Sequence, residues 1–488
     1  MPDRGSAAEL VCRGLLLAYL CWLPLPFGSL TEWAQPPLIA GALLICAAAA
    51  IVRASVIPSH SEESPAGGGS LALLGMTPVF RLWALAAICF LAVAALELLP
   101  LPDALLGVLS PESLRTWRDA GHIAALAGAG APSSMHPLTV DPQATSLHLF
   151  RVAAYFAVFT AAALLIRRHR HRVALALALG AAALFETLYG IRELLLGRHA
   201  IWGWVNGLIF NNRVFGTFVN PNHFAHYAAI VLPLGVYLAA GAWHDAAPEG
   251  VPPRRRVVRL VEKRFFHFAC GAAIAAACVA AILAAQSRGA LVASAGGFAV
   301  VGAMASGPRH ALRRGVLIAV SAAAILLAVV FLSGLRIASR LQEPELATLG
   351  GRALPVKAAL DLWKRFPLFG TGLGTFGEVS SMTYAGSPEV ISNHAHDDYV
   401  EVLATTGVTG LLAALIPLLG GYIALIRATF GASGAALTWT RRSFQIAALT
   451  SITTALLHAL IDFNFFIPAN PATLAAMAGS AAALRERR

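Results

Sequence analysis

A cluster of ionisable side chains stands directly before one of the longest apolar segments of the chain. Residues 393–399 read Asn-His-Ala-His-Asp-Asp-Tyr, and residues 400–426 are almost wholly apolar. Ionisable groups at the mouth of a membrane helix are expensive, and they are usually retained for binding or chemistry. The types present suit proton transfer, because histidine changes charge near neutral pH. The alternative is a solvated, capped helix end, and the spacing alone does not decide between the two.

A helix that begins at this cluster would point its positive dipole end at it. We predict Asn393 as the N-cap, because an asparagine side chain accepts hydrogen bonds from the first free N–H groups. The dipole favours an anion such as phosphate and disfavours imidazolium, so His396 would stay neutral and available as a base. In such a helix His396 and Tyr399 share a face, whereas His394 and His396 do not.

Three arginines stand at turns between apolar segments. Arg213 precedes Gly-Thr-Phe and the helix-breaking Asn-Pro-Asn of Asn220 and Asn222, Arg288 lies in a Gln-Ser-Arg-Gly hairpin, and Arg352 follows two glycines. Broken helices at membrane depth usually line a cavity. A planar guanidinium binds oxyanions bidentately, so three arginines on one face suit a diphosphate. The alternatives are a simple re-entrant turn at Asn220 and a lipid headgroup contact for Arg288.

Metal, nucleotide and cofactor sites find little support. His223 and His226 lie a turn apart, but no acidic residue accompanies them as a third ligand. None of the six cysteines forms a CxxC pair, which disfavours zinc, iron–sulfur and disulfide frameworks. Gly370–Gly374 is glycine-rich but follows no strand, so it does not predict a nucleotide loop. We interpret His458 and Asp462, one turn apart, as a structural pair, and we predict neither a metal nor a cofactor.

The composition predicts an all-α polytopic membrane protein. Of the 488 residues 58% are hydrophobic and only 12% are charged, about half the charge of a soluble domain. Apolar runs near 20 residues recur along the whole length. The net charge of +11 comes in short basic clusters between these runs, a pattern that sets membrane topology and does not indicate a nucleic-acid partner.

We predict about twelve membrane-spanning helices, near residues 14–30, 36–52, 81–99, 146–166, 173–196, 215–241, 267–285, 289–306, 315–334, 400–427, 444–461 and 470–485. With this count five basic clusters fall on one side of the membrane, at residues 167–172, 254–264, 309–314, 441–442 and 485–488. The positive-inside rule makes that side, with both termini, cytoplasmic.

The predicted chain has four regions. They are an N-terminal region of helices and a first outer loop (1–145), a central helical bundle (146–334), a large outer loop (335–399) and C-terminal helices (400–488). Within the large loop, Arg352 to Arg365 reads as an amphipathic helix that could lie along the membrane surface, with Leu354, Leu360 and Trp363 as apolar anchors.

Taken together, these motifs resemble the bacterial O-antigen ligase and polymerase superfamily. The resemblance spans about residues 150–470. It rests on Gly-Thr-Phe with Asn-Pro-Asn, on Ser-Arg-Gly, on Gly-Gly-Arg and on three later segments: Pro-Leu-Phe-Gly-Thr-Gly-Leu-Gly-Thr-Phe (367–376), His-Ala-His-Asp-Asp-Tyr (394–399) and Gly-Val-Thr-Gly-Leu-Leu (407–412).

The resemblance implies a bundle of twelve helices similar to membrane-embedded C-type glycosyltransferases, in the bacterial inner membrane. It implies transfer of a glycan from undecaprenyl diphosphate to a lipid A-core or glycan acceptor on the periplasmic side, in lipopolysaccharide or other polysaccharide biosynthesis. His396, with His394 nearby, would be the base. Arg213, Arg288 and Arg352 would hold the diphosphate.

Further candidate substrate-binding residues lie beside these motifs: Asn220, Asn222, Asp398 and Tyr399. The family usually has Asn where this chain has Asp397 or Asp398, so the base stays open among the two histidines and these two aspartates. Ligase and polymerase activities also stay open, and a polyprenyl-lipid transporter is a rival of another class. A transporter should carry charges inside several spans, whereas here Glu186 is an exception among nearly charge-free interiors.

Overall fold

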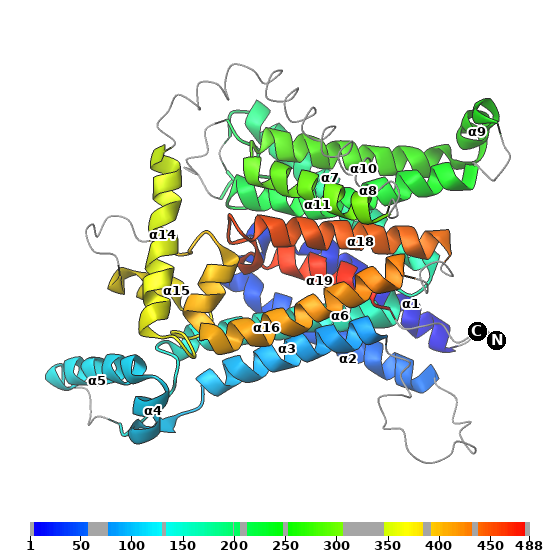
Figure 1. Ribbon diagram of the computed structural model, residues 1–488. Coiled ribbons are helices and arrows are strands. Elements are labelled where there is room, and N and C mark those ends of the chain that lie inside the picture. The colour runs from blue at the N-terminus through cyan, green and yellow to red at the C-terminus, as the bar shows by residue number, and fades with distance from the viewer. Residues whose placement is uncertain are drawn as a thin grey trace, which may run out of the picture.

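The computed structural model describes residues 4–56, 77–128, 133–198, 200–204, 212–246, 252–305, 346–383, 392–431 and 438–483. Long helices run side by side in a bundle, and a group of shorter elements gathers at one end of it (Figure 1). The long helices are α1 (Arg4–Trp22), α2 (Gln35–Val56), α3 (Pro78–Glu97), α6 (Pro142–Leu165), α7 (His169–Leu195), α8 (Pro221–Ala246), α10 (Phe265–Ala284), α11 (Arg288–Ala305), α16 (Asp398–Phe430), α18 (Trp439–His458) and α19 (Ala469–Ala481).

The shorter elements connect these helices. Two short strands, β1 (Leu101–Pro102) and β2 (Met135–His136), pair antiparallel. The other α-helices are α4 (Asp103–Leu109), α5 (Pro111–Leu126), α9 (Pro253–Arg259), α14 (Leu346–Arg365) and α15 (Phe376–Val379). Single turns of other helix types are η1 (Phe27–Ser29), η2 (Glu32–Ala34), η4 (Leu260–Arg264), η5 (Ser380–Met382) and η6 (Asn464–Phe466).

Eight helices of the described residues are long and apolar enough to cross a membrane, and they include α2, α3, α6, α7, α8, α10, α11 and α16. The helices predicted near residues 14–30, 444–461 and 470–485 are present as α1, α18 and α19 but are not among the eight. The span predicted at 315–334 lies outside the described residues. The sequence was therefore right about a multi-pass helical protein, and its count of twelve stays a prediction.

Local sequence signals explain where several helices begin. The Thr77 hydroxyl accepts from Phe80 N at 3.2 Å and caps α3. Asp141 caps α6 by accepting from the N–H groups of Gln143 and Ala144. Both caps precede a proline at the first helical position, where its missing N–H costs nothing.

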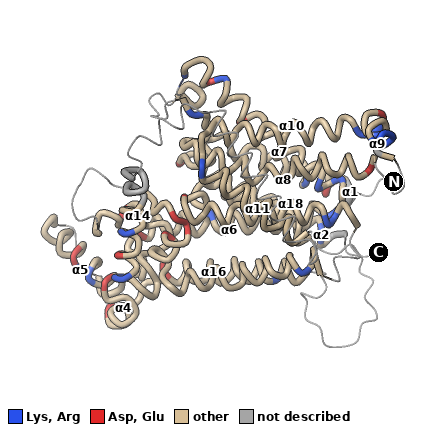
Figure 2. The backbone as a smooth tube through the Cα atoms, turned by 45° about the horizontal axis from the view of Figure 1, so that its top comes forward, with Lys and Arg blue, Asp and Glu red and all other residues tan. Residues whose placement is uncertain are grey.

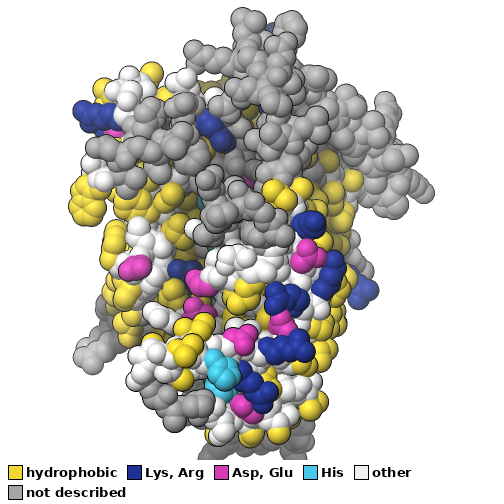
Figure 3. Space-filling view, turned by 90° about the vertical axis from the view of Figure 1, so that its left-hand side faces the viewer, with side chains coloured by type: hydrophobic (Ala, Val, Ile, Leu, Met, Phe, Trp, Pro, Cys, Tyr) yellow, Lys and Arg dark blue, Asp and Glu magenta, His cyan; other side chains and the backbone are white. Residues whose placement is uncertain are grey.

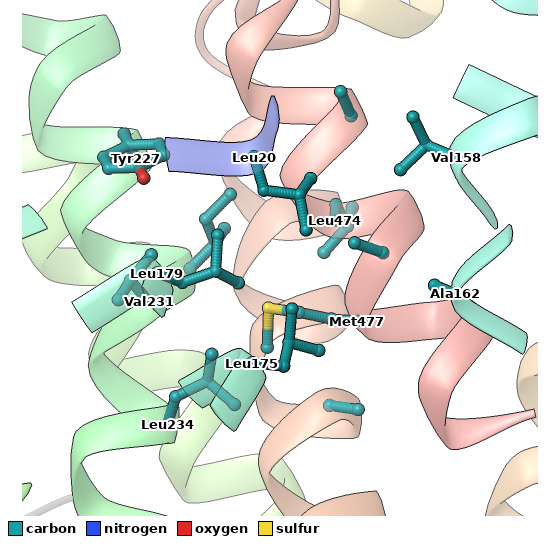
Figure 4. Packing of buried hydrophobic residues seen from close by; sticks show 14 of the residues in the cluster. Leu20, Val158, Ala162, Leu175, Leu179, Tyr227, Val231, Leu234, Leu474 and Met477 are labelled. Atoms are coloured by element: carbon teal, nitrogen blue, oxygen red, sulfur yellow. The ribbon is translucent and has the colours of Figure 1, made fainter. Parts of the chain in front are cut away.

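The bundle core is built from aliphatic side chains of α1, α6, α7, α8 and α19, and Figure 4 shows Leu20, Leu179 and Leu474 meeting there. Small residues allow the closest helix contact. A Cβ on Gly235 of α8 would lie 2.7 Å from Ala275 N, and one on Gly271 of α10 would lie 2.4 Å from Ala239 N. Helices in lipid gain stability from such backbone proximity, because burial away from lipid offers no hydrophobic gain.

The two ends of the bundle carry different charges. Figure 2 shows lysines and arginines concentrated around α9, at the same end of the bundle as the start of α1. The basic residues at 167–172 and 441–442 lie at the same end: His169 contacts Tyr237 near the end of α8, and Trp439 stacks on His244. The clusters at 309–314 and 485–488 lie outside the described residues. The described basic clusters thus share one end with the start of α1 and the end of α19, opposite α5 and α14 (Figure 1).

The glycine-rich segment after α14 fits into a break in α16. Gly407 has φ +63° inside the helix, and a Cβ there would lie 2.2 Å from Leu368 O. The break frees backbone groups that the glycine-rich segment takes up: Thr371 N donates to Ala404 O and Gly372 N to Thr405 O, while Val408 N donates to Pro367 O. The two glycine motifs of the sequence therefore form one backbone junction, and neither has the form of a nucleotide loop.

The burial pattern of α14 shows which of its faces packs on the protein. Leu354 is 52% exposed and Trp363 is half-buried, whereas Leu362 and Phe366 are buried against Phe376 of α15. This packing holds the second half of α14 at the mouth of α16. The face with Leu354 is left open for contact with lipid, and the placement of this helix along the membrane surface stays a prediction.

Candidate active site

The histidine cluster lies on a non-helical loop just before α16. Asp397, and not Asn393, is the N-cap: its Oδ1 accepts from Tyr399 N at 2.9 Å and from Val400 N at 3.0 Å. His394 and His396 precede the helix, and His396 has φ +57°, a conformation that histidine adopts more readily than most residues. The predicted shared face of His396 and Tyr399 was therefore wrong, because the helix starts two residues after His396.

Phe463 is the centre of the cluster. The ring of His394 stacks on it at 4.1 Å with an interplanar angle of 15°. His396 and His223 approach it edge-on, with centroids at 4.9 Å and 4.6 Å. Segments far apart in the sequence thus place three imidazoles around one aromatic ring, between α18 and α19 on one side and the starts of α8 and α16 on the other.

Each histidine of the loop faces a buried carboxylate. His394 Nδ1 lies 2.8 Å from Glu401 Oε1, and His396 Nδ1 lies 3.5 Å from Asp462 Oδ1. Both carboxylates are about 1% exposed, whereas the His394 and His396 side chains are 23% and 27% exposed. The carboxylates orient the rings from inside and leave each ring open to solvent on its other side.

Asp462 also faces the buried His223, whose Nε2 lies 3.9 Å from its Oδ1. Burial by itself raises the pKa of the Asp462 carboxyl, but the contacts with His223 and His396 and the nearby His458 outweigh it and hold that pKa well below its usual value. Asp462 therefore stays ionised at neutral pH and can stabilise a proton gained by His396.

The two aspartates that the sequence offered as alternative bases have structural partners. Asp397 caps α16, and burial raises the pKa of its carboxyl, with the two capping N–H donors opposing that rise. Asp398 is buried and accepts from Phe465 N at 3.3 Å. The Tyr399 hydroxyl donates to Leu456 O at 3.0 Å. Asp398 and Tyr399 thus hold the segment that carries Phe463, Asp397 is occupied as a helix cap, and His394 and His396 are partly exposed.

Arg213 connects the end of α10 to the start of α8. Its Nε donates to Ala285 O at 2.8 Å, just after α10, and its Nη2 donates to Asn222 Oδ1 at 2.7 Å, at the start of α8. Asn220 accepts from Asn222 N through its side chain, which shapes the turn. Arg198, which the sequence did not single out, lines a small cavity of about 10 Å³ together with Arg213. That volume holds about one water, so an anion would meet Arg213 from the surface.

Arg288 opens α11 close to the histidine cluster. A Cβ on the next residue, Gly289, would lie 2.7 Å from His458 Nε2, so this hairpin packs on the end of α18. His458 in turn contacts His226, with 2.9 Å between their Nδ1 atoms. The structure therefore brings Arg213 and Arg288 to the same end of the bundle as His394 and His396. Arg352 belongs to α14, and its side chain lies outside the described residues.

The face of the molecule at this end carries acidic and basic side chains in close alternation (Figure 3). Ion pairs connect α4, α5, β2 and α14 here: Arg118 and His136 contact Asp103, and Arg365 contacts Glu112. The predicted outer loops are thus held together by surface charges above the histidine cluster.

Glu401 and Phe463 were missed from the sequence. Glu401 lies inside a run that reads as a membrane span, and Phe463 is 67 residues from His396 in the chain. The signal in the sequence for Glu401 is its acidic side chain at the start of an apolar run, five residues after His396. Asp462 was assigned to His458 alone, because helical spacing was assumed, whereas α18 ends at His458.

Residues 273–415 match the family described as O-antigen ligase. This match supports the resemblance of the chain to the O-antigen ligase and polymerase superfamily. The matched segment contains Arg288, α14, the glycine-rich junction and both loop histidines, and it ends before Asp462 and Phe463. No curated protein matches the chain. The superfamily supports a ligase or polymerase type of activity and a multi-pass membrane protein, with lipid-linked and acceptor glycans as the general class of partners.

Proposed function

We propose that this protein transfers a glycan from undecaprenyl diphosphate to a hydroxyl of a lipid A-core acceptor. The reaction would take place at the periplasmic face of the bacterial inner membrane. The observation that carries the proposal is His396, an accessible imidazole whose Nδ1 faces the buried Asp462 carboxylate at 3.5 Å. A base oriented by a carboxylate is the arrangement that activation of a hydroxyl requires.

In this mechanism His396 Nε2 takes the proton from the acceptor hydroxyl as the oxygen attacks the anomeric carbon of the donor. The bond from that carbon to the diphosphate oxygen breaks, and undecaprenyl diphosphate leaves with the bonding electron pair. Asp462 stabilises the imidazolium that forms. The contact of 3.5 Å is long for a hydrogen bond, as is common before substrate binds.

The leaving diphosphate needs stabilisation of charge and little else. Arg213 and Arg288 reach the same end of the bundle as His396, at the starts of the polar turn before α8 and of α11. Guanidinium groups in a site that excludes water stabilise departing oxyanions strongly. We assign Arg352 to the same task, as the third cation of the family motif.

A polymerase that extends one lipid-linked glycan with another is the second candidate. The same base and the same arginines would serve it, and only the acceptor differs. The transporter alternative loses its main support, because Glu186, the buried acid within a span, binds the backbone and hydroxyl of Thr217 at 2.7 and 2.8 Å. That carboxylate anchors the Gly-Thr-Phe turn.

A transfer assay with purified protein, lipid-linked glycan donor and lipid A-core tests the proposal. His396→Ala should lower turnover about 100-fold or more, the usual contribution of a general base. His122→Ala, an exposed histidine of α5 at the same end, is the matched control and should transfer normally. Near-normal turnover in the His396 variant would remove this residue from the mechanism.

A further inference from the structure

The two loop histidines lie on different sides of Phe463. His396 lies towards α8, where Asp462 and His223 approach it. His394 lies towards α6, where its ring centroid is 5.2 Å from that of Phe466. The same Phe466 ring lies 5.9 Å from the ring of His148, a residue of α6. The cluster therefore has two halves that share Phe463.

His394 is held more firmly than His396. One oxygen of Glu401 binds His394 Nδ1 at 2.8 Å, and the other accepts from Ala395 N at 2.7 Å. With the ring flat on Phe463, the position and tilt of His394 are both set. In the tautomer whose Nδ1–H donates to Glu401, Nε2 carries a lone pair that can accept a hydrogen bond, and the side chain is 23% exposed.

Arg213 lies towards the His396 half of the cluster. Arg213 binds Asn222, the residue before His223, and His223 contacts Asp462. A diphosphate held there leaves from the α8 half of the cluster. In a direct displacement the attacking oxygen approaches the anomeric carbon opposite the leaving oxygen. The acceptor must then enter from the side away from Arg213, with its reacting hydroxyl at His396 and the rest of the sugar over His394.

We propose that His394 binds the acceptor sugar by accepting a hydrogen bond from one of its hydroxyls at Nε2, and that Glu401 is the positioning residue for this contact. The ligand class is a polyhydroxylated sugar at the acceptor position. His396 then carries out the proton transfer, and His394 sets how well the acceptor is held. This inference rests on the proposed glycan transfer and adds the acceptor subsite to it.

Steady-state kinetics with varied acceptor and saturating donor test the inference. His394→Ala should raise the acceptor KM about tenfold, the loss expected for one hydrogen bond, with a much smaller change in kcat. His394→Gln should restore part of the acceptor affinity, because its amide can occupy the position of Nε2. Glu401→Gln should raise the same KM, since the amide nitrogen cannot accept from Ala395 N.

The acceptor KM of the double variant His394→Ala with Glu401→Gln should equal that of His394→Ala alone, because both substitutions remove the same contact with the acceptor. Thermal melting in detergent and an unchanged donor KM verify that the variants fold. A fall in kcat with unchanged acceptor KM in both His394 variants would overturn the inference and place His394 in the chemical step. Lack of any transfer by the wild-type protein would instead refute the proposed function. Failure of the acceptor subsite and failure of the proposed function therefore give different results.

Discussion

The two ends of the bundle use the same kinds of charged residue in opposite ways. At the end with α9, Arg254 and Arg255 are exposed, and Arg264 pairs with Asp245 at 3.2 Å on the surface. At the other end, Glu401, Asp398 and Asp462 are at most 3% exposed, and each contacts a backbone N–H or an imidazole. Exposed charge costs little and can serve topology, whereas buried charge is expensive and is retained for a specific task.

The difference shows that position, rather than residue type, separates topological from functional charge. An arginine at the α9 end can be replaced without a partner being left buried. A carboxylate at the other end cannot be replaced in this way, because its loss leaves backbone N–H groups or imidazoles around Phe463 without their acceptor. Substitutions matched across the two ends therefore test this distinction.

The largest contrast should come from arginines. Arg288→Ala should lower transfer about 100-fold, by analogy with loss of one oxyanion-stabilising group, whereas Arg255→Ala in α9 should transfer normally. Arg288→Lys should recover only part of the loss, because an ammonium cannot form a planar bidentate contact. Equal activity of the Arg288→Ala and Arg255→Ala proteins in the purified assay would abolish the contrast between the ends.

A contrast in stability should follow from two glycines. Gly407→Ala should destabilise the protein by about 2 kcal/mol or more, because the left-handed backbone is costly for alanine and the Cβ would lie 2.2 Å from Leu368 O. Gly14→Ala in α1 has nothing within 4 Å of its added Cβ. It should stabilise slightly, by about 0.5–1 kcal/mol. Thermal melting in detergent measures both, and equal melting temperatures would show that the junction at Gly407 is dispensable.

The smallest expected effect on glycan transfer is that of single-cysteine variants made to test the membrane orientation. Single cysteines at the exposed positions Arg255 and Met382, in a cysteine-free background, should leave transfer almost unchanged. A membrane-impermeant thiol reagent added to intact cells with a permeable outer membrane should label position 382 and not position 255, because the positive-inside rule places α9 in the cytoplasm. Labelling of 255 alone would invert the orientation and move the histidine cluster to the wrong compartment.

Much of the helical architecture could be predicted from apolar runs, since these runs also set helix length. The geometry of the cluster could not. Asn393 and Asp397 are both good N-caps, and choosing between them required the left-handed turn at His396. Glu401 is hidden within an apolar run, and Phe463 and Asp462 reach His396 only through packing of α18 against α16. The histidines could be predicted from their residue type, whereas their carboxylate partners are brought to them only by tertiary contacts.

The most direct test of the account is a double-mutant cycle between His396 and Asp462, measured as kcat of glycan transfer. If the two side chains act as one base, Asp462→Asn should lower kcat about 10–100-fold, and adding it to His396→Ala should lower kcat no further. Effects that multiply in the double variant would contradict the account, because they would show that Asp462 acts independently of His396.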